Sequence, residues 1–141
     1  MNRTPPEPTP GTLTVADFIA IMSPAARNLL FAALEAFRKN TGRARRLLAA
    51  AEKASQDERE LCYTLHVESM ILAYLGEAHV AVRKDMECLD LCSCLGLKCL
   101  RADALSHLSS VYRDLGFRDL QRAYDSEGDR HTDDGEKKVD E

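Results

Sequence analysis

Cysteine is the residue type in this chain with the clearest capacity for chemistry, because four of the five cysteines fall within twelve residues. Cys88 and Cys92 are four residues apart and so share one face of a helix, while Cys94 and Cys99 flank Gly96. Four thiolates could bind zinc, but tetrahedral zinc sites favour ligand pairs two to four residues apart on sharp turns. The irregular gaps here favour packing, since a cysteine thiol often packs as a small hydrophobe. We therefore expect no metal and no other cofactor, although a metal or redox role for the cluster stays open.

Histidine is the second candidate for chemistry. His66, His79 and His107 are separated along the chain, one in each of three predicted helices. His66 and His107 could form a proton-transfer pair, but partly exposed histidines on amphipathic helices are the simpler interpretation. The chain has no glycine-rich phosphate loop, no H-E-x-x-H, no G-x-S-x-G and no paired C-x-x-C motif. These observations predict a protein that is not an enzyme.

A basic turn without any acidic residue is the third unusual segment. Arg38 and Lys39 lie at the C-terminal end of the helix predicted from Pro24, where the helix macrodipole favours positive charge. The three arginines that follow Gly42 begin the next helix, where the macrodipole opposes each of them by about 0.3–1 kcal/mol. This unfavourable placement indicates a use elsewhere, such as an acidic partner, a phosphate group or the protein's own acidic tail, while a solvated turn is the simpler alternative. A wide basic face with aromatic platforms is missing, so we expect no nucleic-acid partner. The five cations are Arg38, Lys39, Arg43, Arg45 and Arg46.

The composition is that of one ordinary domain, with 141 residues, 45% hydrophobic and 30% charged. We expect a disordered Pro-rich arm at residues 1–13, a folded domain at 14–126 and a disordered acidic tail at 127–141. The longest apolar run, Leu29–Leu34, is far shorter than the roughly 20 residues that cross a bilayer, and the N-terminus does not resemble a signal peptide. Together with an odd number of cysteines, this favours a cytoplasmic protein with reduced thiols and no membrane partner.

Between Pro24 and the C-terminus no proline interrupts the chain, which therefore predicts helix throughout. Thr14 with Asp17, Ser23 with Pro24, and Asp57 with Glu60 are the predicted helix starts. Glycines are the predicted stops, at positions 42, 76, 96 and 116. The predicted helices are Thr14–Met22, Pro24 to about Lys39, Arg43–Ala54, 58–75, Glu77–Cys94, Lys98–Leu115 and Phe117–Ser126.

Two stretches of the chain match at an offset of forty residues. With Gly76 aligned to Gly116, Leu65 pairs with Leu105 and Ser69 with Ser109. The offset from Gly42 to Gly76 is thirty-four, the period of a tetratricopeptide unit. Both serines should lie at helix–helix contacts, where small side chains let helices approach closely. The residues expected to be buried are Leu30, Leu34, Leu47, Leu65, Leu72, Leu75, Leu105, Leu108 and Tyr112.

The segment from Leu105 to Gly116 resembles the first helix and turn of a tetratricopeptide repeat, and the resemblance extends over about residues 24–126. The tryptophan of the family's first helix is missing, as is its closing proline, and Gln121 stands where a small residue is expected. The resemblance implies an all-α fold of about three stacked antiparallel helix–turn–helix hairpins, forming a segment of a right-handed solenoid with a concave groove. It also implies a non-enzymatic protein–protein interaction module, such as an adaptor, a small chaperone or a regulatory scaffold.

The same resemblance assigns a partner-binding groove on the first helix of each hairpin. At most of the positions where the family's carboxylate-binding members carry Lys, Asn or Arg, this chain has His66, Met70, Ser106 and Ser110, so a partner helix or extended segment is expected instead. A self-associating structural protein, including a homodimer, and a small-ligand-sensing domain remain alternatives. The predicted groove residues are Tyr63, His66, Met70, Ala73, Tyr74, Asp103, Ser106, Ser110, Arg113 and Asp114.

Overall fold

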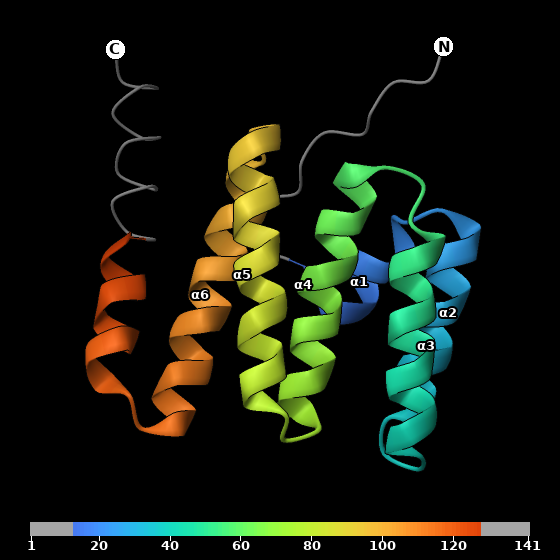
Figure 1. Cartoon of the computed structure of the whole chain (residues 1–141), viewed down its shortest axis with the longest axis horizontal. Helices are drawn as coiled ribbons and strands as arrows, with labels where there is room; N and C mark the ends of the chain where they lie inside the picture. Colours follow the sequence, from blue (N-terminus) through green and yellow to red (C-terminus); the bar gives the residue numbers. More distant parts are fainter. Residues whose placement is uncertain (1–12, 128–141) are drawn as a thin grey trace.

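The computed structural model describes residues 13–127, and within that range the chain forms helices and no strand, which confirms the all-α prediction (Figure 1). Nearly all of the predicted arm and of the predicted tail lie outside the described residues. Consecutive helices run antiparallel because each is joined to the next by a turn of a few residues. The helices are α1 (Val15–Ala20), α2 (Pro24–Ala36), α3 (Thr41–Ala54), α4 (Glu58–Tyr74), α5 (Ala78–Leu95), α6 (Lys98–Leu115) and a terminal helix at residues 118–127.

Two of the predicted helix starts are confirmed by their capping bonds. The backbone N–H of Asp17 donates to Thr14 Oγ1 at 3.2 Å, and the Asp17 carboxylate accepts from the Thr14 N–H at 3.0 Å. At the start of α4, Asp57 accepts from the backbone N–H of Glu60 at 2.8 Å. In both cases the side chain satisfies a backbone donor that has no partner within the helix.

The predicted helix start at Ser23 and Pro24 is also confirmed, since α2 begins at Pro24 with Ser23 at its N-cap, whereas the predicted helix stop at Gly42 is wrong. Ser23 makes no capping bond to α2; its hydroxyl donates to the Glu60 carboxylate, and its backbone N–H donates to the same carboxylate at 2.9 Å. Helix α2 ends at Ala36, and Gly42 lies inside the first turn of α3. Asn40 begins that helix by accepting from the Arg43 N–H at 3.0 Å, so an asparagine cap, rather than a glycine stop, sets this boundary.

The other three glycines repeat one turn at intervals of twenty residues. Gly76, Gly96 and Gly116 have φ values of 81°, 71° and 85°, in the left-handed region that glycine adopts without a steric penalty. In each turn the residue after the glycine, which directly precedes the next helix, donates its N–H back to a carbonyl five residues earlier, at 2.9–3.1 Å. This is the Schellman arrangement, and it explains why the ends of α4, α5 and α6 were predictable.

The contacts of the two aligned serines repeat at forty residues. Ser69 Oγ donates to the carbonyl of Ala81 at 2.7 Å, and Ser109 Oγ donates to the carbonyl of Gln121 at 3.4 Å. Both serines are buried, as predicted. The hairpin of α4 and α5 and the hairpin of α6 and the terminal helix therefore make the same first-to-second-helix contact.

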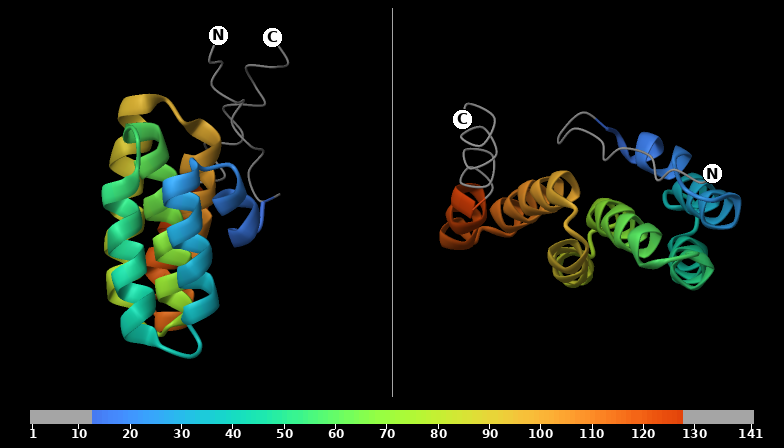
Figure 2. Two further views of the ribbon diagram at one scale, coloured as in Figure 1. Left: turned by 90° about the vertical axis from the view of Figure 1, so that its right-hand side faces the viewer. Right: turned by 90° about the horizontal axis from the view of Figure 1, so that it is seen from above.

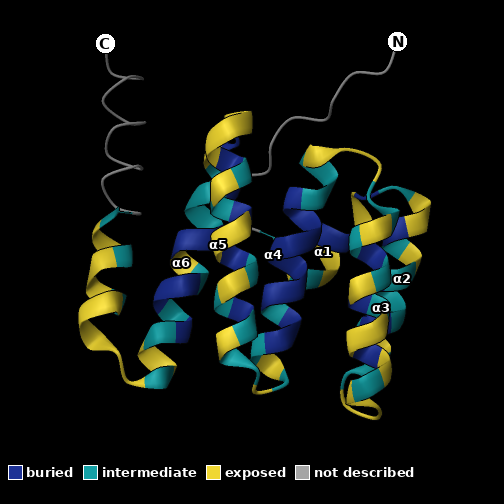
Figure 3. Cartoon of the chain, in the orientation of Figure 1, coloured by how far each residue is buried: buried dark blue, intermediate teal, exposed yellow. Residues whose placement is uncertain are grey.

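Helix α4 is the centre of the molecule, since its residues 62–69 are all buried and α1, α2, α3, α5 and α6 all contact it (Figure 3). Of the nine residues predicted to be buried, Leu30, Leu65, Leu72, Leu105 and Leu108 are buried. The other four are only partly buried: Leu34, Leu47, Leu75 and Tyr112. Two of these lie in the first hairpin, which α4 covers incompletely, and Tyr112 packs near the end of the array against the rings of Phe117 and Tyr124.

The hairpins do not stack evenly. Helices α2 and α3 pack closely on each other, and α4, α5 and α6 pack closely in sequence, but α3 and α4 contact each other over far fewer residues. A groove between α3 and α5 results, with pockets of about 520 and 280 Å³ that both include Glu52. Helix α1 contacts both α2 and α4 and so joins the first hairpin to the rest (Figure 2).

Candidate functional site

The candidate site lies on the face that α2, α4 and α6 present away from α3 and α5, which we call the inner face (Figure 2, right). The predicted groove residues all come from α4 and α6, and so belong to two of its helices. Helix α1 lies against this face beside α2 and α4. The inner face is therefore divided into a part that α1 covers and a part that remains open.

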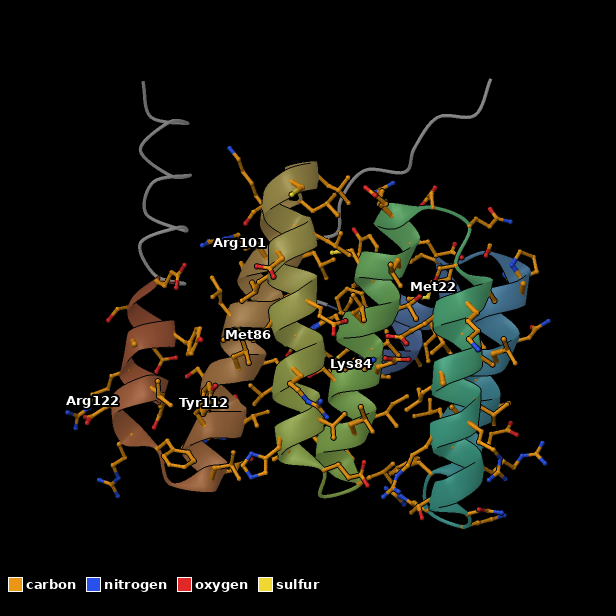
Figure 4. All side chains as sticks on the ribbon, viewed as in Figure 1. Met22, Lys84, Met86, Arg101, Tyr112 and Arg122 are labelled. Atoms are coloured by element: carbon orange, nitrogen blue, oxygen red, sulfur yellow. The ribbon has the colours of Figure 1, made fainter. Side chains whose placement is uncertain are left out.

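The covered part contains two of the predicted groove residues. The ring of Phe18 in α1 lies 6.1 Å from the Tyr63 ring and 5.4 Å from the His66 ring, measured between centroids. Met22 packs close by, with its sulfur 3.8 Å from the Thr64 hydroxyl (Figure 4). Tyr63 and His66 are only 4% and 2% exposed. The prediction that these two line an open groove is thus wrong, because the chain's own first helix occupies that position.

The open part is a pocket of about 250 Å³ near the end of α4. Tyr74 at its edge is 74% exposed, and its ring lies 6.3 Å from that of Phe37, the C-cap residue of α2. Ser106 and Arg113 are exposed but do not line this pocket. The lining residues, five of which were predicted, are Met70, Ala73, Tyr74, His107, Ser110, Val111 and Asp114.

His107 connects this pocket to a buried polar cluster that the sequence did not reveal. Asp85 of α5 is completely buried and lies between two histidines, with Oδ1 2.9 Å from His66 Nδ1 and Oδ2 2.5 Å from His107 Nδ1. The two imidazole rings are 5.8 Å apart and nearly perpendicular. The expectation of partly exposed histidines is therefore wrong for His66, which is buried, and correct for His107; the two are not separate, because Asp85 contacts both. One signal was present: Asp85 shares the buried face of α5 with Ala81, four residues earlier.

The electrostatics of this cluster favour an ionised aspartate facing a protonated histidine. Burial alone lowers the pKa of His66, but the charge of Asp85 and the hydrogen bond to it outweigh burial, so the pKa is raised. Burial also tends to raise the pKa of Asp85, yet the charge of His66 and the hydrogen bonds from both histidines lower it overall. Asp85 therefore holds a buried negative charge that the two rings stabilise.

The neighbouring Ser69 does not complete a nucleophilic relay. Its hydroxyl lies 3.2 Å from His107 Nδ1, the same nitrogen that contacts Asp85. A serine–histidine–aspartate triad requires the serine on one ring nitrogen and the carboxylate on the other. The Ser69 hydroxyl also donates to the carbonyl of Ala81. The arrangement is thus a hydrogen-bonded network that joins three helices rather than an activated nucleophile.

A second buried cluster joins α4 to α5 through sulfur. Cys62 Sγ lies 3.6 Å from Cys88 Sγ and 3.3 Å from Cys92 Sγ. Hydrogen bonding to the other thiols lowers the pKa of Cys92, with further contributions from the charges of His66 and Arg101, and raises that of Cys88. Cys88 and Cys92 are buried, as the expectation of packing requires, but the four cysteines that are close in the sequence do not come together. Cys94 is exposed and Cys99 is half-buried, and Cys62 from α4 takes part instead.

A third buried ionisable group faces the groove between α3 and α5. Glu68 is 1% exposed, and its Oε2 lies 3.5 Å from the ammonium of Lys84, which also contacts the Glu52 carboxylate at 2.7 Å (Figure 4). Burial, followed by the nearby Glu52 charge, raises the pKa of Glu68 to about 9. This side chain is therefore neutral in the folded protein at pH 7.

The five cations of the predicted basic turn are all exposed. Arg45 forms an ion pair with Glu77, and the Arg38 guanidinium lies 5.3 Å from the centroid of the Phe37 ring. Arg45 therefore has an acidic partner within the chain, at the N-cap of α5. Arg43 contributes its backbone N–H to the Asn40 cap.

Comparison with known proteins gives no relative from which a function could be transferred. No family model, curated protein sequence or solved structure matches the chain. Within residues 13–127, none of the helices combines the length and the apolarity that crossing a bilayer requires.

Proposed function

We propose that the protein is a non-enzymatic interaction module that binds a short amphipathic helix of a partner protein on the open part of its inner face. The observation that carries this proposal is the position of α1. This six-residue helix lies on the covered part of the same face and buries Phe18, Ile19 and the adjoining Met22. The face thus already accommodates a short helix with aromatic and aliphatic anchors.

The open pocket has suitable chemistry for a second such segment. Met70, Ala73 and Val111 provide apolar surface, and the exposed Tyr74 is a residue type that is enriched among the dominant contacts of protein interfaces. Asp114, which lines the pocket, forms an ion pair with Arg113 at 3.5 Å, and this pair provides polar contacts beside the apolar anchor. A volume of about 250 Å³ falls below the roughly 300–1,000 Å³ of small-molecule sites, which favours a partner side chain over a free ligand.

The proposed architecture is a short tetratricopeptide-like array of three hairpins, with the inner face as its concave side. Two observations support it: the Schellman turns at Gly76 and Gly116, and the equivalent contacts of Ser69 and Ser109. The sparse contact between α3 and α4 is a departure from even stacking.

Photocrosslinking tests the function directly. A photoreactive amino acid at position 74 of the full-length chain should crosslink a partner protein in cells. The same group at position 117, which is also exposed, should not crosslink that partner. The crosslinked segment, made as a peptide, should bind the purified protein. Tyr74→Ala should weaken that binding about tenfold or more, the loss typical of a dominant aromatic contact, and Phe117→Ala should not. Equal crosslinking at both positions, or binding unaffected by Tyr74→Ala, would refute the proposal.

Self-association is a second candidate because of the C-terminal end of the array. Phe117 and Leu120, at the start of the terminal helix, are 50% and 41% exposed. Covering them with a second copy of the chain would remove this apolar surface from water. Light scattering distinguishes the two functions: a dimer that Phe117→Ser converts to a monomer supports self-association, whereas a wild-type monomer excludes it.

A further inference from the structure

The sulfur cluster between α4 and α5 already has the dimensions of a metal–thiolate site. Cys62 Sγ is 3.6 Å from Cys88 Sγ and 3.3 Å from Cys92 Sγ, and the last two are 3.9 Å apart. A point equidistant from the three sulfurs lies about 2.1 Å from each, and a shift of about 1 Å out of their plane gives roughly 2.3 Å, the length of a zinc–thiolate bond. A metal ion could therefore reach all three sulfurs without a rearrangement of the helices.

Helix packing, rather than a flexible loop, holds these sulfurs in place. Cys88 and Cys92 are one turn apart on α5, and Cys62 faces them from the adjacent α4. All three side chains are at most 1% exposed. The three sulfur–sulfur separations of 3.3, 3.6 and 3.9 Å are all within the range of thiol hydrogen bonds, so the three thiols contact one another directly.

The number of donors indicates which metal fits. Within residues 13–127, no fourth histidine, cysteine, aspartate or glutamate joins the cluster. Zinc in structural sites almost always takes four ligands, whereas soft thiolates also select Cu(I), a d¹⁰ ion that is stable with three. The positive charge of Arg101 acts on Cys92 and offsets part of the negative charge of a metal–thiolate group.

We propose that Cys62, Cys88 and Cys92 form a trigonal binding site for Cu(I). Each thiol releases its proton when the ion binds, and three sulfur–copper bonds form without a change in oxidation state. The site lies between α4 and α5, and none of its three cysteines lines the partner pocket at Tyr74.

The test uses the full-length, reduced protein under anaerobic conditions, in a Cys94→Ser/Cys99→Ser background that removes the two remaining thiols. Cu(I) is titrated in competition with a chromophoric Cu(I) chelator. We expect one ion per chain, three sulfur neighbours in X-ray absorption, and a higher melting temperature of the loaded protein. Each of Cys62→Ser, Cys88→Ser and Cys92→Ser should weaken binding about 100-fold or more. The alanine variants serve where a serine variant does not fold, as judged by circular dichroism.

Three results would overturn the assignment. The first is binding of Cu(I) with equal affinity by the variant that lacks all three cysteines, which would show adventitious binding. The second is tighter binding of Zn²⁺ than of Cu(I), with a fourth ligand to zinc seen by X-ray absorption. The third is formation of a disulfide within the cluster with no metal bound by the reduced protein.

Discussion

Replacing Glu68 with glutamine should stabilise the protein, and the gain should grow with pH. Glu68 is buried against α3, and burial together with the Glu52 charge raises its pKa from 4.5 to about 9. The folded protein therefore keeps a proton on Glu68 that the unfolded chain loses above pH 4.5. The contribution of the protonated Glu68 to the free energy of unfolding is fully present below pH 4.5 and is lost as pH rises towards 9. Glutamine is neutral throughout and avoids this loss.

The magnitude follows from the shift. Each pH unit between 4.5 and 9 removes at most about 1.4 kcal/mol, so the loss at pH 7 has an upper bound of about 3.4 kcal/mol. Lys84 is about a quarter exposed, and it lines a pocket of about 280 Å³ together with Glu68. Water in that pocket and the nearby ammonium reduce the penalty, and we expect a gain of about 1–2 kcal/mol at pH 7.

Urea unfolding followed by circular dichroism at pH 5, 7 and 8.5 measures this difference. The quantity of interest is the change with pH of the difference in unfolding free energy between Glu68→Gln and the wild type. Glu35→Gln, an exposed substitution on α2, is the matched control and should show almost no change. A difference that stays constant from pH 5 to 8.5 for Glu68→Gln would refute the reasoning.

Two further substitutions test the core of the array. Asp85→Asn should destabilise the protein by about 3 kcal/mol, because it leaves two histidines facing a neutral side chain in the core, whereas Asp90→Asn, exposed on the same helix, should be close to neutral by urea unfolding. In the wild type, the contribution of the Asp85 cluster to the unfolding free energy should be lost as pH falls through the lowered pKa of Asp85, and also as pH rises through the raised pKa of His66. If Asp85→Asn changed the unfolding free energy as little as Asp90→Asn, the buried ion pair would be contradicted. Ser109→Trp should overpack the contact between α6 and the terminal helix and cost about 1–3 kcal/mol of stability. Ser106→Trp, on the exposed side of α6, should leave the melting temperature nearly unchanged. Equal melting temperatures of these two variants would argue against the repeat.

The sequence predicted those helix boundaries that depend on local chemistry. Thr14 and Asp57 bond to backbone groups three residues away, and Gly116 adopts the left-handed conformation that ends a helix. The errors occurred where two local signals competed. Gly42 lies two residues after Asn40, and only the asparagine has a side chain that can cap the next helix.

The candidate site was less predictable because its groups come from distant parts of the chain. Asp85 contacts histidines 19 and 22 residues away, and Cys62 contacts sulfurs 26 and 30 residues away. Such contacts depend on how two helices are aligned along their shared face. The periodicity of apolar residues along one helix does not predict that alignment. The burial of Tyr63 depends likewise on how α1 folds back onto α4.

The uneven stacking has a consequence for cooperativity. In a linear array, stability is approximately the sum of each unit and its interfaces with its neighbours, so a weak interface separates units that can open independently. The weak interface here lies between α3 and α4, and it is bridged by α1 and by the bonds between Ser23 and the Glu60 carboxylate. Amide exchange should therefore resolve the α2–α3 hairpin from α4–α6 once α1 is removed. A helix of six residues would then determine whether the domain unfolds in one transition or in two.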